Sequence, residues 1–162
     1  MGVVISQSLG PKFIDRYLSV DYNLDKGTFG NVYGPIQWKY TQLVIKKTKF
    51  AVGNVTDAFK QRIQDKKKLW TSLNHKHLVR IHSVDLTRLP EVMFFVMEFA
   101  EGGSLHKTLV SLGSENKLPI YVVTDWAKQI AKGMLYLHQQ DIVHKNFKSS
   151  NSKCLLPKLL TS

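Results

Sequence analysis

Residues 94–105 read Phe-Phe-Val-Met-Glu-Phe-Ala-Glu-Gly-Gly-Ser-Leu. The apolar and aromatic residues at the start of this stretch are typical of a β-strand, which we place at 92–99. The glycine pair that follows interrupts the strand, and Gly102-Gly103-Ser104 leads into a short predicted helix. The stretch therefore predicts a strand, a turn and a helix in immediate succession.

The chain before this stretch reads mostly as β-strands. Its apolar runs are rich in β-branched and aromatic residues and are separated by glycine and proline. Besides 92–99, the predicted strands are 17–24, 31–38, 41–50 and 79–84.

A helix is predicted between the third and fourth of these strands, over 57–73, with Asp57 as its cap. Its apolar residues recur at helical spacing and form one stripe: Phe59, Ile63, Trp70 and Leu73. After residue 105 the chain becomes helical, and 121–139 reads as a long helix with a broad apolar face. Five strands around one helix, followed by helices, predict an α+β fold with the sheet segregated to one end.

Three further motifs carry chemistry. Residues 25–32, Asp-Lys-Gly-Thr-Phe-Gly-Asn-Val, lie between two predicted strands, where glycines let backbone N–H groups close over phosphates. Lys46 lies inside the predicted strand 41–50 and could reach such phosphates, although a lone strand lysine is more often a surface residue. Residues 144–151, His-Lys-Asn-Phe-Lys-Ser-Ser-Asn, come directly after the long helix.

In this order, the four motifs resemble the protein-kinase signature set of glycine-rich loop, strand lysine, hinge and catalytic loop. The runs Val-Met-Glu-Phe-Ala-Glu-Gly-Gly-Ser-Leu (96–105) and Trp-Ala-Lys-Gln-Ile-Ala-Lys-Gly-Met-Leu-Tyr-Leu-His (126–138) are most similar to mixed-lineage and TGF-β-activated kinases. These belong to the tyrosine-kinase-like group of serine/threonine kinases, at the MAP kinase kinase kinase tier. The resemblance covers residues 17–152.

The resemblance implies a domain division. Residues 17–98 would form a complete five-stranded small lobe, 98–103 the hinge and 104–152 the first helices of the large lobe, truncated after the catalytic loop. Residues 1–16 would be an N-terminal extension and 153–162 a C-terminal tail.

The resemblance also implies roles in an ATP site. The loop over the nucleotide would be Gly27, Thr28, Phe29 and Gly30, with Val32 as a roof to the base and Lys46 on the α- and β-phosphates. Met97 would be the gatekeeper, and the Glu98 carbonyl and Ala100 amide would face the adenine edge. Lys148 would lie near the transferred phosphate, and Asn151 would hold a metal ion.

Several positions depart from the family pattern. Asn146 replaces the catalytic-loop aspartate, and a carboxamide cannot accept the substrate hydroxyl proton near neutral pH. Lys66 replaces the helix glutamate that should pair with Lys46; its side chain either faces inward, against a like charge, or turns out to the surface. Asp65 could substitute only if the helix rotated by about 100°.

Further departures concern the nucleotide and the metal. Asp25 would put a negative charge beside bound phosphates, and Val44 would crowd the adenine pocket. No Asp-Phe-Gly segment follows Asn151, so magnesium binding is doubtful and ATP binding should be weak. His75 and His77 match a structural turn of the family.

We therefore expect a truncated pseudokinase that acts as an interaction module and modulates stress or JNK-type signalling. Its partners would be a kinase or scaffold protein of a MAP kinase cascade rather than nucleic acid. Two alternatives remain open: a weak ATP-binding switch, and an incomplete or spliced product of a serine/threonine kinase.

Composition bears on location. The formal charge of +11 favours acidic partners, although a solvated basic surface explains it equally well. The single cysteine, Cys154, cannot form an internal disulfide and favours the cytosol. The start Met1-Gly2-Val3-Val4-Ile5-Ser6 fits the myristoylation pattern at Gly2, so we expect a cytoplasmic protein with peripheral membrane contact as an alternative.

Overall fold

The computed structural model describes residues 9–19, 22–27, 30–49, 56–112 and 118–152. The chain divides into two compact units. We call the first, Met1–Asn74 with Arg80–Phe99, the sheet unit, and the second, His75–Val79 with Ala100–Ser162, the helical unit.

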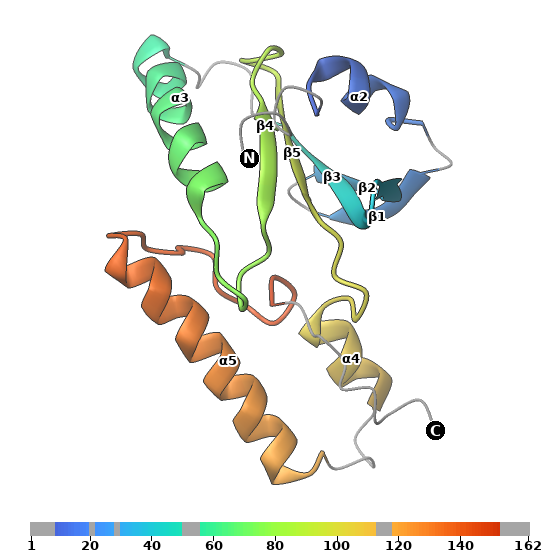
Figure 1. The fold of residues 1–162 in the computed structure, drawn as a ribbon, viewed down its shortest axis with the longest axis vertical. Coiled ribbons are helices and arrows are strands. Elements are labelled where there is room, and N and C mark those ends of the chain that lie inside the picture. Colours follow the sequence, from blue (N-terminus) through green and yellow to red (C-terminus); the bar gives the residue numbers. More distant parts are fainter. Residues whose placement is uncertain (1–8, 20–21, 28–29, 50–55, 113–117, 153–162) are drawn as a thin grey trace. The chain divides into compact units, whose positions relative to one another are not determined.

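The sheet unit is built on one antiparallel sheet of five strands in the order β1-β2-β3-β5-β4 (Figure 1). The strands are β1 (Asn23–Gly27), β2 (Gly30–Trp38), β3 (Thr41–Lys49), β4 (Ile81–Asp85) and β5 (Val92–Glu98). Together with the helices, this sheet confirms the predicted α+β class. The last four strands fall close to their predicted positions, because their alternating apolar residues face two buried layers.

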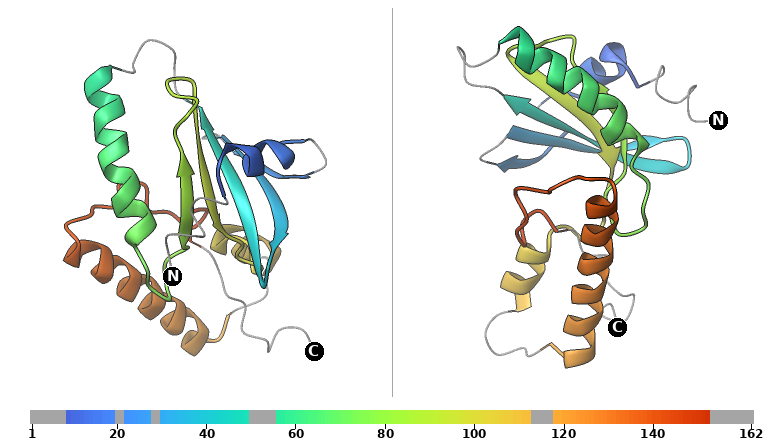
Figure 2. Two further views of the ribbon diagram at one scale, coloured as in Figure 1. Left: turned by 45° about the horizontal axis from the view of Figure 1, so that its top comes forward. Right: turned by 90° about the vertical axis from the view of Figure 1, so that its left-hand side faces the viewer.

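One layer lies between the sheet and a short helix, α2 (Pro11–Arg16), which Figure 2 shows on the opposite side of the sheet from α3. Leu9 and Ile14 are completely buried in this layer. They join buried residues of β2, β3 and β5, namely Tyr33, Ile36, Leu43, Ile45, Phe94 and Val96. The strand expected at 17–24 is therefore largely wrong, since α2 precedes this region, β1 begins only at Asn23, and only the last two predicted residues belong to it.

The other layer lies between the sheet and α3 (Asp57–Ser72). Ile63 is buried there with Val84, Leu86 and Met93. The predicted cap is corrected: Thr56, not Asp57, is the N-cap, and its hydroxyl accepts a hydrogen bond of 3.2 Å from the Phe59 N–H. Asp57 lies one residue further on, in the first turn, and pairs with Lys60 at 2.9 Å.

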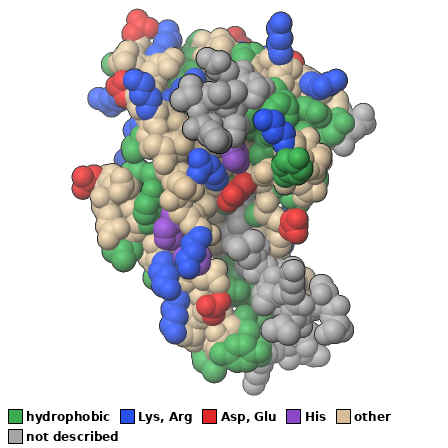
Figure 3. All heavy atoms as spheres, in the orientation of Figure 1, with side chains coloured by type: hydrophobic (Ala, Val, Ile, Leu, Met, Phe, Trp, Pro, Cys, Tyr) green, Lys and Arg blue, Asp and Glu red, His purple; other side chains and the backbone are tan. Residues whose placement is uncertain are grey.

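The helical unit contains α4 (Leu105–Leu112) and α5 (Ile120–Gln139). The His75–Val79 segment packs on α5: the His75 ring stacks on Tyr136 with centroids 4.9 Å apart, and a Cβ on Gly133 would lie 2.9 Å from the His77 carbonyl oxygen. Few apolar side chains are buried here. Figure 3 shows green side chains at the lower end of this unit, where α5 begins with the exposed Ile120 and Tyr121.

Within the described ranges, none of the helices combines the length and the apolar character that crossing a lipid bilayer requires.

Candidate functional site

One face of the sheet collects the side chains that the kinase resemblance assigns to the nucleotide. In the sheet register, Val32 is opposite Lys46 and Val44 is opposite Met97. Residues opposite each other in neighbouring antiparallel strands share a face, and so do residues two apart in one strand. The structure therefore brings Val32, Val44, Lys46 and Met97 together on one side of the sheet.

This face is the one that α3 covers. Lys46 is also opposite Phe95, and Phe95 packs in the layer beneath α3. Val44, whose bulk we expected to crowd an adenine pocket, is buried on this face with 6% of its surface exposed. The space that a nucleotide base would need next to Met97 is thus lined by a β-branched side chain.

The helix glutamate that the resemblance implies as the ion-pair partner of Lys46 is absent, because Lys66 occupies its position. Lys66 is exposed, so of the two orientations left open by the sequence the structure has the outward one. Asp65 is exposed as well, and its Oδ1 accepts a hydrogen bond of 3.0 Å from Gln61 Nε2. Within the described part of the chain, no ion pair joins Lys46 to a carboxylate.

Gly30 holds the base of the glycine-rich loop. Its φ of +132° and its contact with β3 both require glycine, because a Cβ there would lie 1.7 Å from the Lys47 carbonyl oxygen. Gly27 is paired with Gly30 at the ends of β1 and β2. The tip of the loop, Thr28 and Phe29, lies outside the described residues, as does Gly2.

The hinge has one backbone N–H group, that of Ala100, for which the described residues provide no backbone acceptor. The Glu98 N–H donates to the Arg80 carbonyl at 3.0 Å, and the Phe99 N–H donates to the Gln42 carbonyl at 2.9 Å. The Ala100 carbonyl accepts from the Gly103 N–H at 3.0 Å, whereas the Ala100 N–H has no backbone acceptor among the described residues. This donor is the group that the resemblance assigns to the adenine edge.

A side-chain hydrogen bond closes the segment that the resemblance assigns to the catalytic loop. The Asn151 Nδ2 group donates to the Asn146 carbonyl oxygen at 2.8 Å and closes the loop from one end to the other. The loop is also fixed to the start of α4, where the Leu105 N–H donates to the Ser152 carbonyl at 2.8 Å and the His106 N–H donates to the Ser149 carbonyl at 3.2 Å. The side chains of Asn146 and Lys148 are exposed.

Sequence reasoning missed the structural role of Asn151. Its amide hydrogen is used within the loop, which leaves its Oδ1 as the atom that could bind a cation. Magnesium prefers several oxygen ligands, usually with one or two carboxylates among them. The described residues contain no group of three or more His, Cys, Asp or Glu side chains that could hold a metal ion.

The geometry defines a kinase-like small lobe with a catalytic loop, and comparison with known families agrees. Residues 18–160 match the family described as protein tyrosine and serine/threonine kinase. The chain belongs to this family.

Its relatives include MAP kinase kinase kinases. The chain is 32% identical to mitogen-activated protein kinase kinase kinase 10 of Xenopus laevis over 137 residues. These residues are 83% of this chain and 13% of the relative. It is 34% identical over 98 residues to mitogen-activated protein kinase kinase kinase mlk-1 of Caenorhabditis elegans, covering 59% and 9%. These matches confirm the predicted resemblance.

A third relative is named for a different cellular process. Cytokinesis protein sepH of Aspergillus terreus is 30% identical over 129 residues, which cover 79% of this chain and 9% of the relative. The chain spans about an eighth or less of the length of the relatives named here. The shared part is the kinase domain, so the matches assign a family and not a pathway.

Proposed function

We propose that this chain is a catalytically inactive kinase-like module that binds a kinase or a scaffold protein of a MAP kinase cascade. The observation that carries the proposal is the carboxamide of Asn146 at the position that the resemblance assigns to the catalytic base, in a loop that the Asn151–Asn146 hydrogen bond closes. Phosphoryl transfer in this family depends on positioning and charge neutralisation, and a missing base alone should lower the rate by about 10²–10⁴-fold.

A second observation supports the proposal independently. The exposed Lys66 cannot brace Lys46, and Asp65 is turned to Gln61. A lysine without its acidic partner is not held in place for the phosphates. The two losses affect one catalytic arrangement, so their effects on the rate need not add.

The test is a γ-phosphate transfer assay with a generic protein acceptor and with the chain itself. We expect the wild type to transfer no more phosphate than Lys46→Met. The double variant Asn146→Asp/Lys66→Glu restores the family residues at both positions, and Asn146→Ala/Lys66→Ala is its matched control. Transfer by the wild type that Lys46→Met abolishes would show that the chain is an active kinase.

A second candidate function is a weak nucleotide-binding switch. It is favoured by the unused Ala100 N–H and by the shared sheet face of Val32, Lys46 and Met97. ATP would then bind through the hinge and Lys46, and magnesium would add little because Asn151 supplies only one oxygen.

A thermal-shift titration with ATP, with and without magnesium, tests this second function. We expect a small upward shift of Tm that magnesium does not enlarge and that Lys46→Met reduces. Ala100→Pro removes the hinge donor and should abolish the shift, with Ala100→Ser as the control that keeps the N–H. No shift for the wild type at millimolar ATP rules the switch out and leaves the interaction module.

A further inference from the structure

Along α3 the cations outnumber the carboxylates, and among the described residues only Lys60 forms an ion pair with one of them. Lys60 pairs with Asp57, and Asp65 is hydrogen-bonded to Gln61. Arg62, Lys66 and Lys68 form no ion pair within the described residues, and the residues themselves are exposed. Arg62 and Lys66 lie one turn apart on the same side of α3, which we call the α3 basic face, whereas Lys68 lies on the opposite side of the helix.

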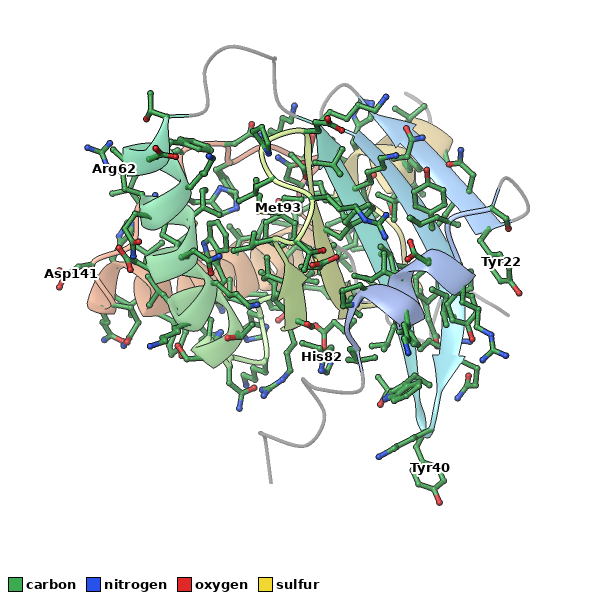
Figure 4. The ribbon with its side chains drawn as sticks, turned by 90° about the horizontal axis from the view of Figure 1, so that it is seen from above. Tyr22, Tyr40, Arg62, His82, Met93 and Asp141 are labelled. Carbon is green, nitrogen blue, oxygen red and sulfur yellow. The ribbon has the colours of Figure 1, made fainter. Side chains whose placement is uncertain are left out.

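The inner side of α3 fixes the direction of these cations. Ile63 is buried against the sheet, and Trp70 packs edge-on against Phe95 with ring centroids 5.3 Å apart. The helix cannot turn about its axis without losing these contacts. Figure 4 shows the Arg62 side chain pointing away from the sheet at the outer side of α3.

The like charges on this face lower the stability of α3. Arg62 and Lys66 are four residues apart, so they lie one turn apart on the same side and repel each other. Lys67 and Lys68 directly follow Lys66 and add to the local positive potential. An external group of carboxylates would relieve this repulsion.

One apolar side chain accompanies the cations. Leu69 is 37% exposed and lies three residues from Lys66 and seven from Arg62, on the same side of the helix. The surface thus offers two cations and a small apolar contact along one stripe. An extended or helical segment with carboxylates around a single apolar residue complements this pattern.

We propose that the α3 basic face is a docking site for an acidic segment of a partner protein. The inference rests on the proposed function and names the surface that such an interaction module would use. Lys66 stands at the position where the family places an internal glutamate. The change of charge therefore turns a position used for catalysis into part of the outer surface.

Other occupants fit less well. Single-stranded nucleic acid is bound with aromatic side chains on which bases stack, and the aromatic residues of α3, Phe59 and Trp70, pack against the sheet instead. A helix that lies in a lipid surface needs a wide apolar face directed outward, and Leu69 is the only large apolar residue that α3 exposes.

The experiment measures binding of a fluorescein-labelled ten-residue peptide with one apolar residue, Glu-Glu-Ser-Glu-Asp-Leu-Glu-Glu-Ser-Gly, to the full chain by fluorescence anisotropy. Three variants are compared with the wild type. The α3 variant is Arg62→Glu/Lys66→Glu, and the matched control, Lys12→Glu/Lys49→Glu, changes the net charge equally at exposed positions elsewhere in the sheet unit. A milder α3 variant has glutamine at Arg62 and Lys66.

We expect the α3 variant to weaken peptide binding at least about tenfold at physiological ionic strength, and the control by less than about threefold. The glutamine variant should lie between them. Circular dichroism checks that each variant keeps its helices, and the glutamine variant carries the test if the glutamate variant unfolds.

Three results would overturn the inference: no binding of the peptide by the wild type, equal weakening in both charge-reversal variants, or tighter binding to phosphatidylserine vesicles or to an oligonucleotide than to the peptide. None of them affects the phosphotransfer result, because that result is read from the wild type and Lys46→Met, which both keep Arg62 and Lys66. Failure here with an inactive wild type refutes the docking surface and leaves the proposed function in place.

Discussion

The sheet unit and the helical unit bury very different amounts of apolar surface. The sheet unit has one layer of core on each side of its sheet, and Leu9, Ile14, Ile45 and Val96 are completely buried there. Among the described residues of the helical unit, Leu137 is the only apolar side chain in the buried core, and α4 has none.

The two units are therefore stabilised by different kinds of interaction. Burial of apolar side chains is the main favourable contribution to folding, at about 25 cal/mol per Å². The sheet unit can use it, whereas the helical unit depends on helix caps, the stacking of His75 on Tyr136 and the hydrogen bonds of the catalytic loop. Each measurement below would break or sharpen this comparison.

The largest expected effect is in amide hydrogen exchange. Amides of β3 and β5 should exchange only when the sheet unit unfolds, while amides of α4 should exchange through local opening. Opening free energies range from about zero to the full unfolding free energy, so the two regions should differ by roughly 100-fold or more in protection. Equal protection of β5 and α4, measured by mass spectrometry, would show that the units unfold together.

Substitution of two phenylalanines should give the next largest contrast. Phe94 is 1% exposed at the centre of the sheet, and Phe94→Ala should lower the free energy of unfolding by about 3–5 kcal/mol. Phe147 is 54% exposed in the catalytic loop, so Phe147→Ala should change it by less than about 0.5 kcal/mol. Urea denaturation followed by circular dichroism compares them. A large effect of Phe147→Ala would mean that this ring is covered in solution.

Two helix caps provide a matched pair with a smaller effect. The Thr56 hydroxyl accepts from Phe59 N–H, and the Ser104 hydroxyl accepts from Lys107 N–H, both at 3.2 Å. Replacement of either by alanine should cost about 1 kcal/mol. Thr56→Ala should lower the stability of the sheet unit, whereas Ser104→Ala should speed exchange within α4 and leave β5 unchanged. The reverse distribution would contradict the separation of the units.

The smallest expected effect is on pH dependence. Burial, with a contribution from Arg80, lowers the pKa of His82 below 6.5, while Glu98 acts in the opposite direction. The unfolded chain therefore takes up the proton first as the pH falls through 6.5, and stability decreases until the pH passes the folded pKa. His82→Gln should flatten this decrease between pH 7.5 and 5.5.

His77 supplies the comparison in the helical unit. Burial and the positive charges of Lys76 and neighbouring groups lower its pKa too, so His77→Gln should act with the same sign on that unit. If His82→Gln leaves the pH dependence of the sheet unit unchanged, the buried Nε2 atom of His82 does not govern it.

The sequence could predict elements whose pattern is long. β2, β3, β5, α3 and α5 begin and end within about one residue of the predicted positions, because strands of seven to nine residues and helices of four or more turns repeat their apolar pattern several times. α2 is only six residues long, and no period can be detected over such a length. Its burial is decided by the sheet, which the local sequence does not contain.

For the candidate site, too, the sequence could predict some features and left others open. The resemblance assigned Val32, Lys46 and Met97 to one nucleotide site, and the sheet register places them on one face, whereas their roles toward a nucleotide stay predictions. The orientation of Lys66 remained open, since helical spacing favoured the inside and charge favoured the outside. The structure has it exposed, in keeping with the high free energy of burying a lysine without a carboxylate partner.

α2 lies before the region of family similarity, which begins at residue 18. Leu9 and Ile14 nevertheless fill the core beneath the sheet, and the Phe13 ring packs edge-on against Trp38 with centroids 5.0 Å apart. The folded sheet unit therefore begins earlier in the chain than the family similarity, whose start at residue 18 we call the homology border. A polypeptide started at the homology border would leave Tyr33, Ile36 and Leu43 uncovered and prone to self-association.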